Sequence, residues 1–361
     1  MKILLSGDGQ LGQMLGASAI QHGHECLLYS TRTHQVKPLS AQLPLAMTLA
    51  QAIAWADVVS WEHEDIPADV MTLAEHKFLM DAAGIQRLTD RRAEKKLFDD
   101  CAVPTSPWQS YDNVSELQQL LQQSQHDLVL KAARGGYDGK GQWRFARGDD
   151  AVTFAAVAGQ QAGIAEQLIA FDREVSLVGA RAKDGSVVCY PLITNVHRNG
   201  ILSYSIAAVG QLPATLQQQA EHCFQALTNA LQYVGVLAIE FFVVGEGDTA
   251  QLLVNEIAPR VHNSGHWTMN GASCSQFDLH IRALTGMPLP QLRVQPTLLL
   301  NVIGVESIPD ALWQHPQSSC HWYNKTAQPG RKVGHVTIQI DDLESAASWV
   351  ERWAERLQVL A

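Results

Sequence analysis

The sequence predicts an α/β protein of two or three domains that begins with a Rossmann-like unit. Residues 2–6, KILLS, are an apolar strand that leads into GDGQLG, where Gly7, Gly9 and Gly12 have the G-x-G-x-x-G spacing of a strand–turn–helix. Further apolar strands and glycine-rich turns follow along a chain of 361 residues, which is long enough for more than one hydrophobic core.

Composition excludes several classes of protein. Hydrophobic residues make up 46% and charged residues 17%, as is typical of a globular protein. The formal net charge is −10 and basic residues form no run, so no nucleic-acid partner is expected. No segment approaches the roughly 18 apolar residues of a membrane span, and the apolar start is too short for a signal peptide. We therefore expect a cytoplasmic protein without a membrane partner.

The second predicted strand, 25–29, argues against a dinucleotide site. An acidic residue that binds ribose normally stands near the end of this strand, but Tyr29 is followed by Ser, Thr and Arg. The glycine motif therefore indicates the fold more than it indicates NAD, and its helix N-terminus could hold another phosphate. A strand in 57–67 ends in an acidic turn with Glu62, Glu64 and Asp65, where open α/β sheets place ligands. The alternative is a solvated loop.

A glycine-rich loop lies between two predicted strands. Residues 133–143, ARGGYDGKGQW, contain four glycines and Lys140. Glycines let backbone N–H groups approach an anion, and lysine adds a positive charge. No helix or Ser/Thr follows as in a Walker phosphate loop, so we interpret the segment as a flap over nucleotide phosphates. The alternative is a β-hairpin turn without a ligand. The residues before it, 93–108, predict a helix ended by Pro104, and 214–233 predict an amphipathic helix.

Two apolar strands, 234–244 and 250–260, each contain one glutamate. Glu240 lies in the first strand and Glu256 in the second, beside Asn255. A charge is costly to bury in an apolar strand, but two carboxylates on paired strands can share Mg²⁺. Solvated glutamates on edge strands are the alternative interpretation.

Two further segments carry groups that suit anions. The loop after the second strand, 258–273, contains Arg260, two histidines four residues apart and Asn263. Because no H-E-x-x-H glutamate stands between the histidines, anion recognition is preferred to zinc. In the tail, Lys325, Arg331 and Lys332 surround a Pro-Gly turn, an arrangement that suits a dianionic phosphate. A solvated basic loop is the alternative.

The order of these motifs resembles the ATP-grasp superfamily over about residues 90–290. RGGYDGKGQW, REVSLVGAR, NEIAPRVHNSGHWT and HWYNK…PGRKVGH, with the opening GDGQLGQML, resemble the N5-carboxyaminoimidazole ribonucleotide synthase family over nearly the whole chain. The resemblance implies a Rossmann-like domain (1–90), a two-lobed ATP-grasp domain (91–290, with a lid lobe at about 105–170) and a small β-rich C-terminal domain (291–361) that binds substrate.

The activity that the resemblance implies is a step of de novo purine synthesis. ATP, bicarbonate and 5-aminoimidazole ribonucleotide give ADP, phosphate and N5-carboxyaminoimidazole ribonucleotide through carboxyphosphate. The implied cofactors are ATP and one or two Mg²⁺ ions, and the implied assembly is a homodimer. In chemical terms, phosphorylation supplies bicarbonate with a leaving group, and a closed flap protects carboxyphosphate from water.

The resemblance also implies roles for individual residues. Arg260 and Asp138 are expected to be catalytic, and the metal ligands are expected to be Glu240, Asn255 and Glu256. The ATP-binding set is Arg91, Lys131, Gly135, Gly136, Tyr137, Asp138, Gly139, Lys140, Gly141, Glu166, Gln167, Leu168, Ile169, Glu174, His197, Asn255 and Glu256. The substrate-binding set is Tyr137, Asp138, Arg260, His262, Asn263, Ser264, Lys325, Arg331 and Lys332. Gln328 and Leu168 depart from the family pattern, which often has arginine and glycine there.

Three other functions remain as alternatives. Another ATP-grasp ligase, such as a formate-using glycinamide ribonucleotide transformylase or a biotin carboxylase, lacks the PGRKVGH tail and the RVHNSGHW loop. An NAD-dependent oxidoreductase would leave the two glutamate strands unexplained. A non-catalytic nucleotide-binding module would have no need of Glu240, Asn255 and Glu256 together.

Overall fold

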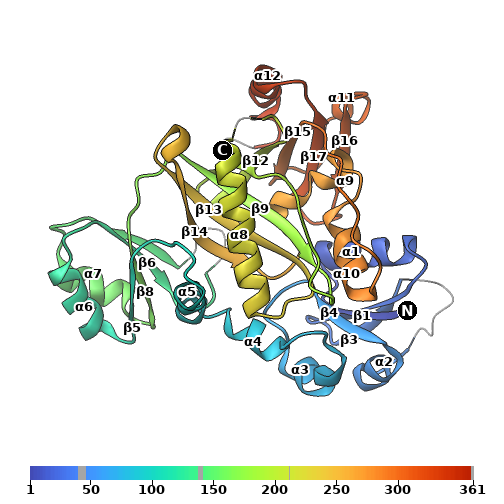
Figure 1. The fold of residues 1–361 in the computed structure, drawn as a ribbon, viewed down its shortest axis with the longest axis horizontal. Helices are drawn as coiled ribbons and strands as arrows, with labels where there is room; N and C mark the ends of the chain where they lie inside the picture. The colour runs from blue at the N-terminus through green and yellow to red at the C-terminus, as the bar shows by residue number, and fades with distance from the viewer. Residues whose placement is uncertain (40–45, 137–140, 211, 359–361) are drawn as a thin grey trace.

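Three β-sheets organise the chain in the computed structural model, which describes residues 1–39, 46–136, 141–210 and 212–358 (Figure 1). The first sheet has the strand order β3-β2-β1-β4. Its strands are β1 (Lys2–Ser6), β2 (Glu25–Ser30), β3 (Gln35–Pro38) and β4 (Val58–Trp61). β1 runs parallel to β2 and β4, and α1 (Gln10–Gln21) connects β1 to β2. The predicted βαβ unit is therefore confirmed. Short helices follow: α2 (Leu49–Trp55), α3 (Ala68–Ala74), η1 (Glu75–Lys77) and α4 (Ala82–Arg87).

The next helix, α5 (Arg91–Asp100), is shorter than the helix predicted for 93–108. It begins earlier because the side chain of Asp90 caps the first turn. It ends at Asp100 because Ala102 adopts a left-handed backbone with φ of 53°, and Pro104 then lacks the N–H that a helix needs. The predicted end of the helix was therefore wrong.

The second sheet forms a separate small lobe, to the left in Figure 1. It is antiparallel and has the order β5-β8-β6-β7. The strands are β5 (Trp108–Tyr111), β6 (Leu128–Ala132), β7 (Gln142–Phe145) and β8 (Gly163–Gln167), and the covering helices are α6 (Val114–Gln123) and α7 (Ala151–Ala158). Leu117 and Leu121 of α6 pack with Leu130 and Ala155 in its own core. β6 and β7 flank the glycine-rich loop, so the predicted strand–loop–strand is confirmed.

The third sheet is the largest of the three and has nine strands, of which β10 pairs only with β9. The order of the others is β14-β13-β9-β11-β12-β15-β17-β16. Their bounds are β9 (Arg173–Arg181), β10 (Val187–Cys189), β11 (Ile193–Arg198), β12 (Ile201–Ala207), β13 (Gly235–Val244), β14 (Gln251–Ala258), β15 (Thr297–Ile303), β16 (Ser318–Trp322) and β17 (Lys332–Gln339). The predicted amphipathic helix is α8 (Ala214–Ala230), whose Leu216, Phe224 and Leu227 are buried against this sheet.

The C-terminal strands β15, β17 and β16 continue the sheet of β9–β14 instead of forming a sheet of their own. The predicted three-domain division, with boundaries near 90 and 290, stays a prediction.

The remaining helices are η2 (Gly247–Thr249), η3 (Asn263–Gly265), α9 (Thr268–Gly271), α10 (Gln276–Thr285), α11 (Asp310–Trp313) and α12 (Leu343–Trp353). None of the helices in the described residues is both long and apolar enough to cross a membrane.

Candidate active site

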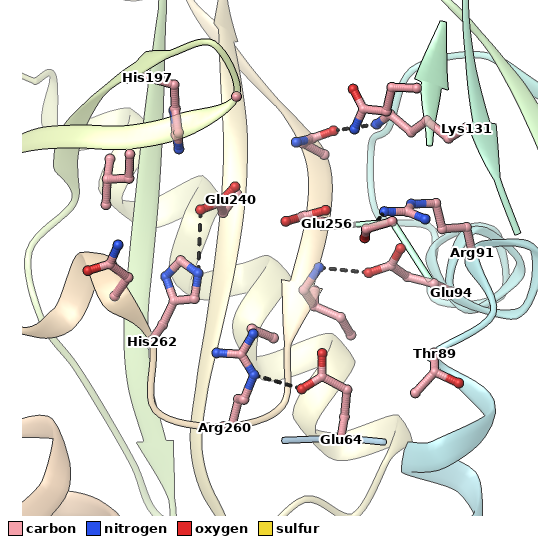
Figure 2. A pocket seen from close by; sticks show the side chains of 18 of the residues that line it. Glu64, Thr89, Arg91, Glu94, Lys131, His197, Glu240, Glu256, Arg260 and His262 are labelled. Carbon is pink, nitrogen blue, oxygen red and sulfur yellow. Dashed lines mark hydrogen bonds and ion pairs between the residues drawn. The ribbon is translucent and has the colours of Figure 1, made fainter. Parts of the chain in front are cut away.

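A cavity of about 1430 Å³ is lined by residues from all three sheets. The first sheet contributes the glycine loop and the acidic turn after β4, the small lobe contributes β6 and β8, and the central sheet contributes β13 and β14. Figure 2 shows the polar side chains on its walls. The predicted site motifs, which lie far apart in the sequence, therefore converge on one space.

A β-bulge shapes the carboxylate wall of this cavity. Glu240 on β13 pairs directly with Glu256 on β14, but the next pair is Phe241 with Val254. Asn255 is thus the extra residue of the bulge. In a regular strand, neighbouring side chains point to opposite faces, whereas here Asn255 and Glu256 both line the cavity.

The carboxylate pair has the chemistry of a Mg²⁺ site. Burial and the negative charge of Glu256 raise the pKa of Glu240 to about 7, so the pair favours a nearby cation. Across the described residues, no group of three or more His, Cys, Asp and Glu side chains could hold a metal ion. Mg²⁺ suits a site with few protein ligands, because it takes its remaining ligands from phosphate oxygens and water. The side-chain oxygen of Asn255 accepts a hydrogen bond from Lys131 (2.9 Å).

Lys131 on β6 reaches from the small lobe to the carboxylate wall (Figure 2). Its ammonium lies 2.6 Å from one carboxylate oxygen of Glu166, which is on the neighbouring strand β8. The other oxygen of Glu166 lies 2.5 Å from the ammonium of Lys95. Glu166 therefore places its carboxylate between two lysines, and Lys95 is a residue that sequence reasoning missed.

Arg91 anchors the start of the glycine-rich loop. Its guanidinium donates to the carbonyls of Ala132 (2.8 Å) and Gly136 (2.7 Å), and Gly135 and Gly136 line the cavity. The flap predictions for Tyr137, Asp138, Gly139 and Lys140 lie outside the described residues. Gly141 is the first described residue after them, and it is not part of the cavity lining.

A second bulge directs His197 into the cavity. The register of β11 against β12 shifts between Val196 and His197, and His197 forms an ion pair with Glu174 of β9. Burial alone would lower the pKa of His197, but the hydrogen bond to Glu174 and the charge of Glu240 raise it above its ordinary value. The imidazole can therefore present positive charge to an anion in the cavity.

Glu64 of the acidic turn holds Arg260 in place. The Arg260 Nε–H donates to a Glu64 carboxylate oxygen at 2.7 Å. Burial would raise the pKa of Glu64, but the guanidinium outweighs it and holds the pKa below its ordinary value. Trp61 adds a hydrogen bond to the carbonyl of Pro259, beside Arg260 (3.1 Å). The first sheet thus orients the predicted catalytic arginine.

His262 lies between this arginine and the carboxylates. Its Nε2 is 3.6 Å from a Glu240 oxygen, and its Nδ1 lies 2.8 Å from the Ser264 hydroxyl. Burial and the charge of Arg260 hold the pKa of His262 well below its ordinary value, so the ring favours its neutral form. Asn263 lines the cavity, whereas Ser264 is buried behind it and bonds to Ser176 (2.9 Å). Ser264 is therefore placed to support His262.

Two of the three predicted tail cations reach the cavity. Lys325 and Lys332 belong to its lining, and both ammonium groups lie over the ring of Tyr323, at 5.5 and 5.6 Å from its centroid. Arg331 is exposed, lies outside the lining, and donates to the carbonyl of Thr326 (3.2 Å).

The glycine motif after β1 encloses a carboxylate of the chain itself. Glu62 accepts hydrogen bonds from the N–H groups of Gly9 (2.9 Å) and Gly12 (2.7 Å). A Cβ on Gly7 would lie 2.1 Å from the Glu62 side chain, and one on Gly12 would lie 2.4 Å from the Gly7 carbonyl. The glycines therefore make room for Glu62 at the position where a dinucleotide-binding fold places phosphate.

Glu94 on α5 is a second residue that sequence reasoning missed. It lines the cavity, is 5% exposed, and accepts the N–H of Ile257 at 2.8 Å (Figure 2). Burial and the charge of Glu256 raise its pKa to about 8. The sequence contains no clear signal for it, because the burial of Glu94, Lys95 and Phe98 on one face of α5 is apparent only from the structure.

Comparison with known proteins identifies the family. The ATP-grasp domain model matches residues 96–277, and a phosphoribosylaminoimidazole carboxylase C-terminal domain model matches residues 297–348. An N5-carboxyaminoimidazole ribonucleotide synthase of Vibrio parahaemolyticus is 42% identical over 349 residues, covering 94% of this chain and 90% of that protein. This chain belongs to the N5-carboxyaminoimidazole ribonucleotide synthase family. Its fold is therefore the predicted ATP-grasp fold.

Solved structures of N5-carboxyaminoimidazole ribonucleotide synthases have the same fold over nearly the whole chain. The enzyme of Thermus thermophilus matches with a TM-score of 0.83 and 34% identity, covering 98% of both chains. The enzyme of Aspergillus clavatus, in complex with ADP and 5-aminoimidazole ribonucleotide, matches with a TM-score of 0.85 and 25% identity, covering 99% of this chain and 98% of that one.

Most residues that the resemblance singled out line the one cavity. On its walls lie Arg91, Lys131, Gly135, Gly136, Glu166, Gln167, Leu168, Ile169, Glu174, His197, Glu240, Asn255, Glu256, Arg260, His262, Asn263, Lys325 and Lys332. Gly141, Ser264 and Arg331 lie outside the lining. The individual roles of these residues in an N5-carboxyaminoimidazole ribonucleotide synthase stay predictions.

Proposed function

We propose that the chain carboxylates 5-aminoimidazole ribonucleotide with bicarbonate at the expense of ATP. The products are N5-carboxyaminoimidazole ribonucleotide, ADP and phosphate. The observation that carries the proposal is that one cavity joins the carboxylate pair and Lys131 to a cationic region with Arg260, Lys325 and Lys332. Membership of the family and the match of the C-terminal domain model favour this reaction over that of another ATP-grasp ligase.

ATP is assigned to the side of the cavity near the small lobe. Lys131 and His197 supply positive charge there, and Arg91 fixes the start of the glycine-rich loop through the Gly136 carbonyl. Glu240, Glu256 and Asn255 would hold one or two Mg²⁺ ions, whose charge stabilises the transferred phosphoryl group. Because phosphoryl transfer needs mainly positioning and charge, these residues suit the first step, the phosphorylation of bicarbonate.

Bicarbonate and the ribonucleotide are assigned to the region of Arg260 and the tail. Arg260, held by Glu64 at 2.7 Å, offers a planar donor group to a carboxylate-like anion. The neutral ring of His262 beside it can hydrogen-bond that anion without a second full charge. Lys325 and Lys332 are assigned to the 5′-phosphate of the ribonucleotide, since both line the cavity.

The test is ADP formation by the purified chain with Mg²⁺. ADP release should require both bicarbonate and 5-aminoimidazole ribonucleotide, and formate with glycinamide ribonucleotide should not replace them. ADP release with formate, or ADP release that does not depend on the ribonucleotide, would contradict the assignment.

We also propose that the chain forms a homodimer, as the resemblance to the family implies. Light scattering at assay concentration measures the molar mass, which should be twice that of one chain.

A further inference from the structure

A buried charge cluster lies behind the nucleotide side of the cavity. It consists of Lys95 on α5, Lys131 on β6 and Glu166 on β8, which are 1%, 6% and 4% exposed. The two ammonium groups contact different oxygens of one carboxylate, at 2.5 Å for Lys95 and 2.6 Å for Lys131. Lys131 and Glu166 line the cavity, whereas Lys95 is not among its lining residues.

The hydrogen bonds distinguish the two lysines. Lys95 uses all three donors of its ammonium: one on Glu166, one on the Thr105 hydroxyl (2.7 Å) and one on the Asn255 carbonyl (3.2 Å). Lys131 has two acceptors among the described residues, Glu166 and the Asn255 side chain (2.9 Å). Among the described residues, Lys131 therefore keeps one N–H donor for a ligand in the cavity. Lys95 has no N–H donor left for a ligand.

The charge balance explains why a carboxylate beside Lys131 need not cancel its positive charge. Burial acts to raise the pKa of Glu166, but Lys131 and Lys95 outweigh it and lower the pKa to about 2, so the carboxylate is ionised. The ammonium of Lys95 lies 2.5 Å from this carboxylate and donates to two further oxygens, surroundings that suit its charged form. Two ammonium groups and one carboxylate leave one net positive charge, whereas Lys131 and Glu166 alone would be neutral.

We propose that Lys95 is a positioning residue that sets the charge of the nucleotide site: by sharing Glu166, it leaves Lys131 effectively cationic toward the phosphates of ATP. Lys95 does so without touching the ligand. The inference rests on the proposed function, because it takes ATP as the ligand of this side of the cavity.

The test compares ATP, ADP and adenosine by calorimetry on the full chain. Lys95→Met keeps the length of the side chain and removes its charge. It should weaken ATP binding roughly ten- to a hundredfold, as expected for the loss of one charge near a polyanion in partly buried surroundings. ADP binding should weaken less, and adenosine binding should not change. Equal loss for all three ligands, or no loss for ATP, would overturn the proposal.

Lys96→Met is the matched control. Lys96 is exposed on the same helix and pairs only with Asp100 in the described chain, so this substitution should leave ATP binding unchanged.

A second comparison covers the case in which Lys95→Met does not fold. Glu166→Gln removes the carboxylate that Lys95 offsets, so the double variant with Lys95→Met and Glu166→Gln again has one net positive charge, on Lys131, and its ratio of ATP affinity to adenosine affinity should match that of the parent chain. The double variant also leaves no buried carboxylate with a missing partner. A ratio at least tenfold lower in the double variant than in the parent chain would overturn the inference while leaving the proposed function intact. A parent chain that binds no ATP would instead overturn the proposed function, and this inference with it.

Discussion

Glu240 and Glu256 show how a single residue can reveal a site from sequence. Each interrupts an apolar strand, and a buried charge without a partner is too costly to be retained for packing. The structure pairs them across β13 and β14, as that argument requires. Glu64 gives no such signal, since acidic residues are ordinary in turns. The sequence suggested a ligand site at this turn, but the contact of Glu64 with Arg260, 2.7 Å away in space and 196 positions away in the chain, is apparent only from the fold.

At the same scale, Glu256→Gln should abolish most turnover while the fold remains. The amide keeps the shape of the side chain but removes the charge that a divalent cation needs. We expect kcat to fall by at least roughly a hundredfold, which corresponds to about 3 kcal/mol of transition-state stabilisation. ADP release with Mg²⁺ measures it. The control is Glu246→Gln in the exposed turn between β13 and β14, which should keep parental turnover. Parental turnover in Glu256→Gln would show that the metal assignment is wrong.

At the scale of elements, register decides which side chains reach the cavity. Strand patterns predicted β13 and β14, but not the bulge that turns Asn255 and Glu256 to the same side. The tail gives a similar lesson. Lys332 is the first residue of β17 and lines the cavity, while its neighbour Arg331 is exposed before the strand begins. The sequence placed both cations near a phosphate and could not separate them, because their separation depends on where the strand starts.

This difference predicts unequal effects of two neighbouring substitutions. Lys332→Met should raise the KM for 5-aminoimidazole ribonucleotide by an amount equivalent to about 1.5–3 kcal/mol, as for a hydrogen bond to a charged group. Arg331→Ala should raise it less, because its guanidinium lies outside the cavity lining. Initial rates at saturating ATP and bicarbonate measure both values, and the KM for ATP should hardly change in either variant. A larger effect from Arg331→Ala would show that the phosphate is bound on the exposed side of the turn.

At the scale of the whole molecule, the sequence predicted the components better than their assembly. Local patterns indicated the βαβ unit, the two glutamate strands and the glycine-rich loop, since each depends on residues close in the chain. The end of α5 was misplaced because the left-handed Ala102 gives no sequence signal. The cluster of Lys95, Lys131 and Glu166 could not be predicted either, because its members lie far apart in the sequence. They belong to helix α5 and to strands β6 and β8 of the small lobe. Contacts of that kind depend on how the sheets pack.

One such packing contact joins the first sheet to the central sheet through His280 of α10. This residue is 2% exposed; its Nδ1 accepts the N–H of Val236 on β13 (3.1 Å), and its Nε2 lies 3.0 Å from the Ser60 hydroxyl on β4. Since Nδ1 accepts, the ring proton is on Nε2 and is donated to Ser60. A second proton on Nδ1 would point at the Val236 N–H, so the charged form of the ring is disfavoured at this position. Burial also disfavours the charged form, and it lowers the pKa of His280 to about 4.

Acid should therefore destabilise the whole molecule through this contact. Below the ordinary histidine pKa of 6.5 the unfolded chain binds a proton that the folded chain excludes, so stability falls as pH decreases from 6.5 toward 4. The full difference corresponds to about 3 kcal/mol from His280. Urea unfolding at a series of pH values measures the slope, which should become shallower in His280→Gln. His126→Gln, at an exposed position, is the control and should keep the parental slope. An unchanged slope in His280→Gln would mean that this histidine is not what makes the junction of the two sheets sensitive to acid.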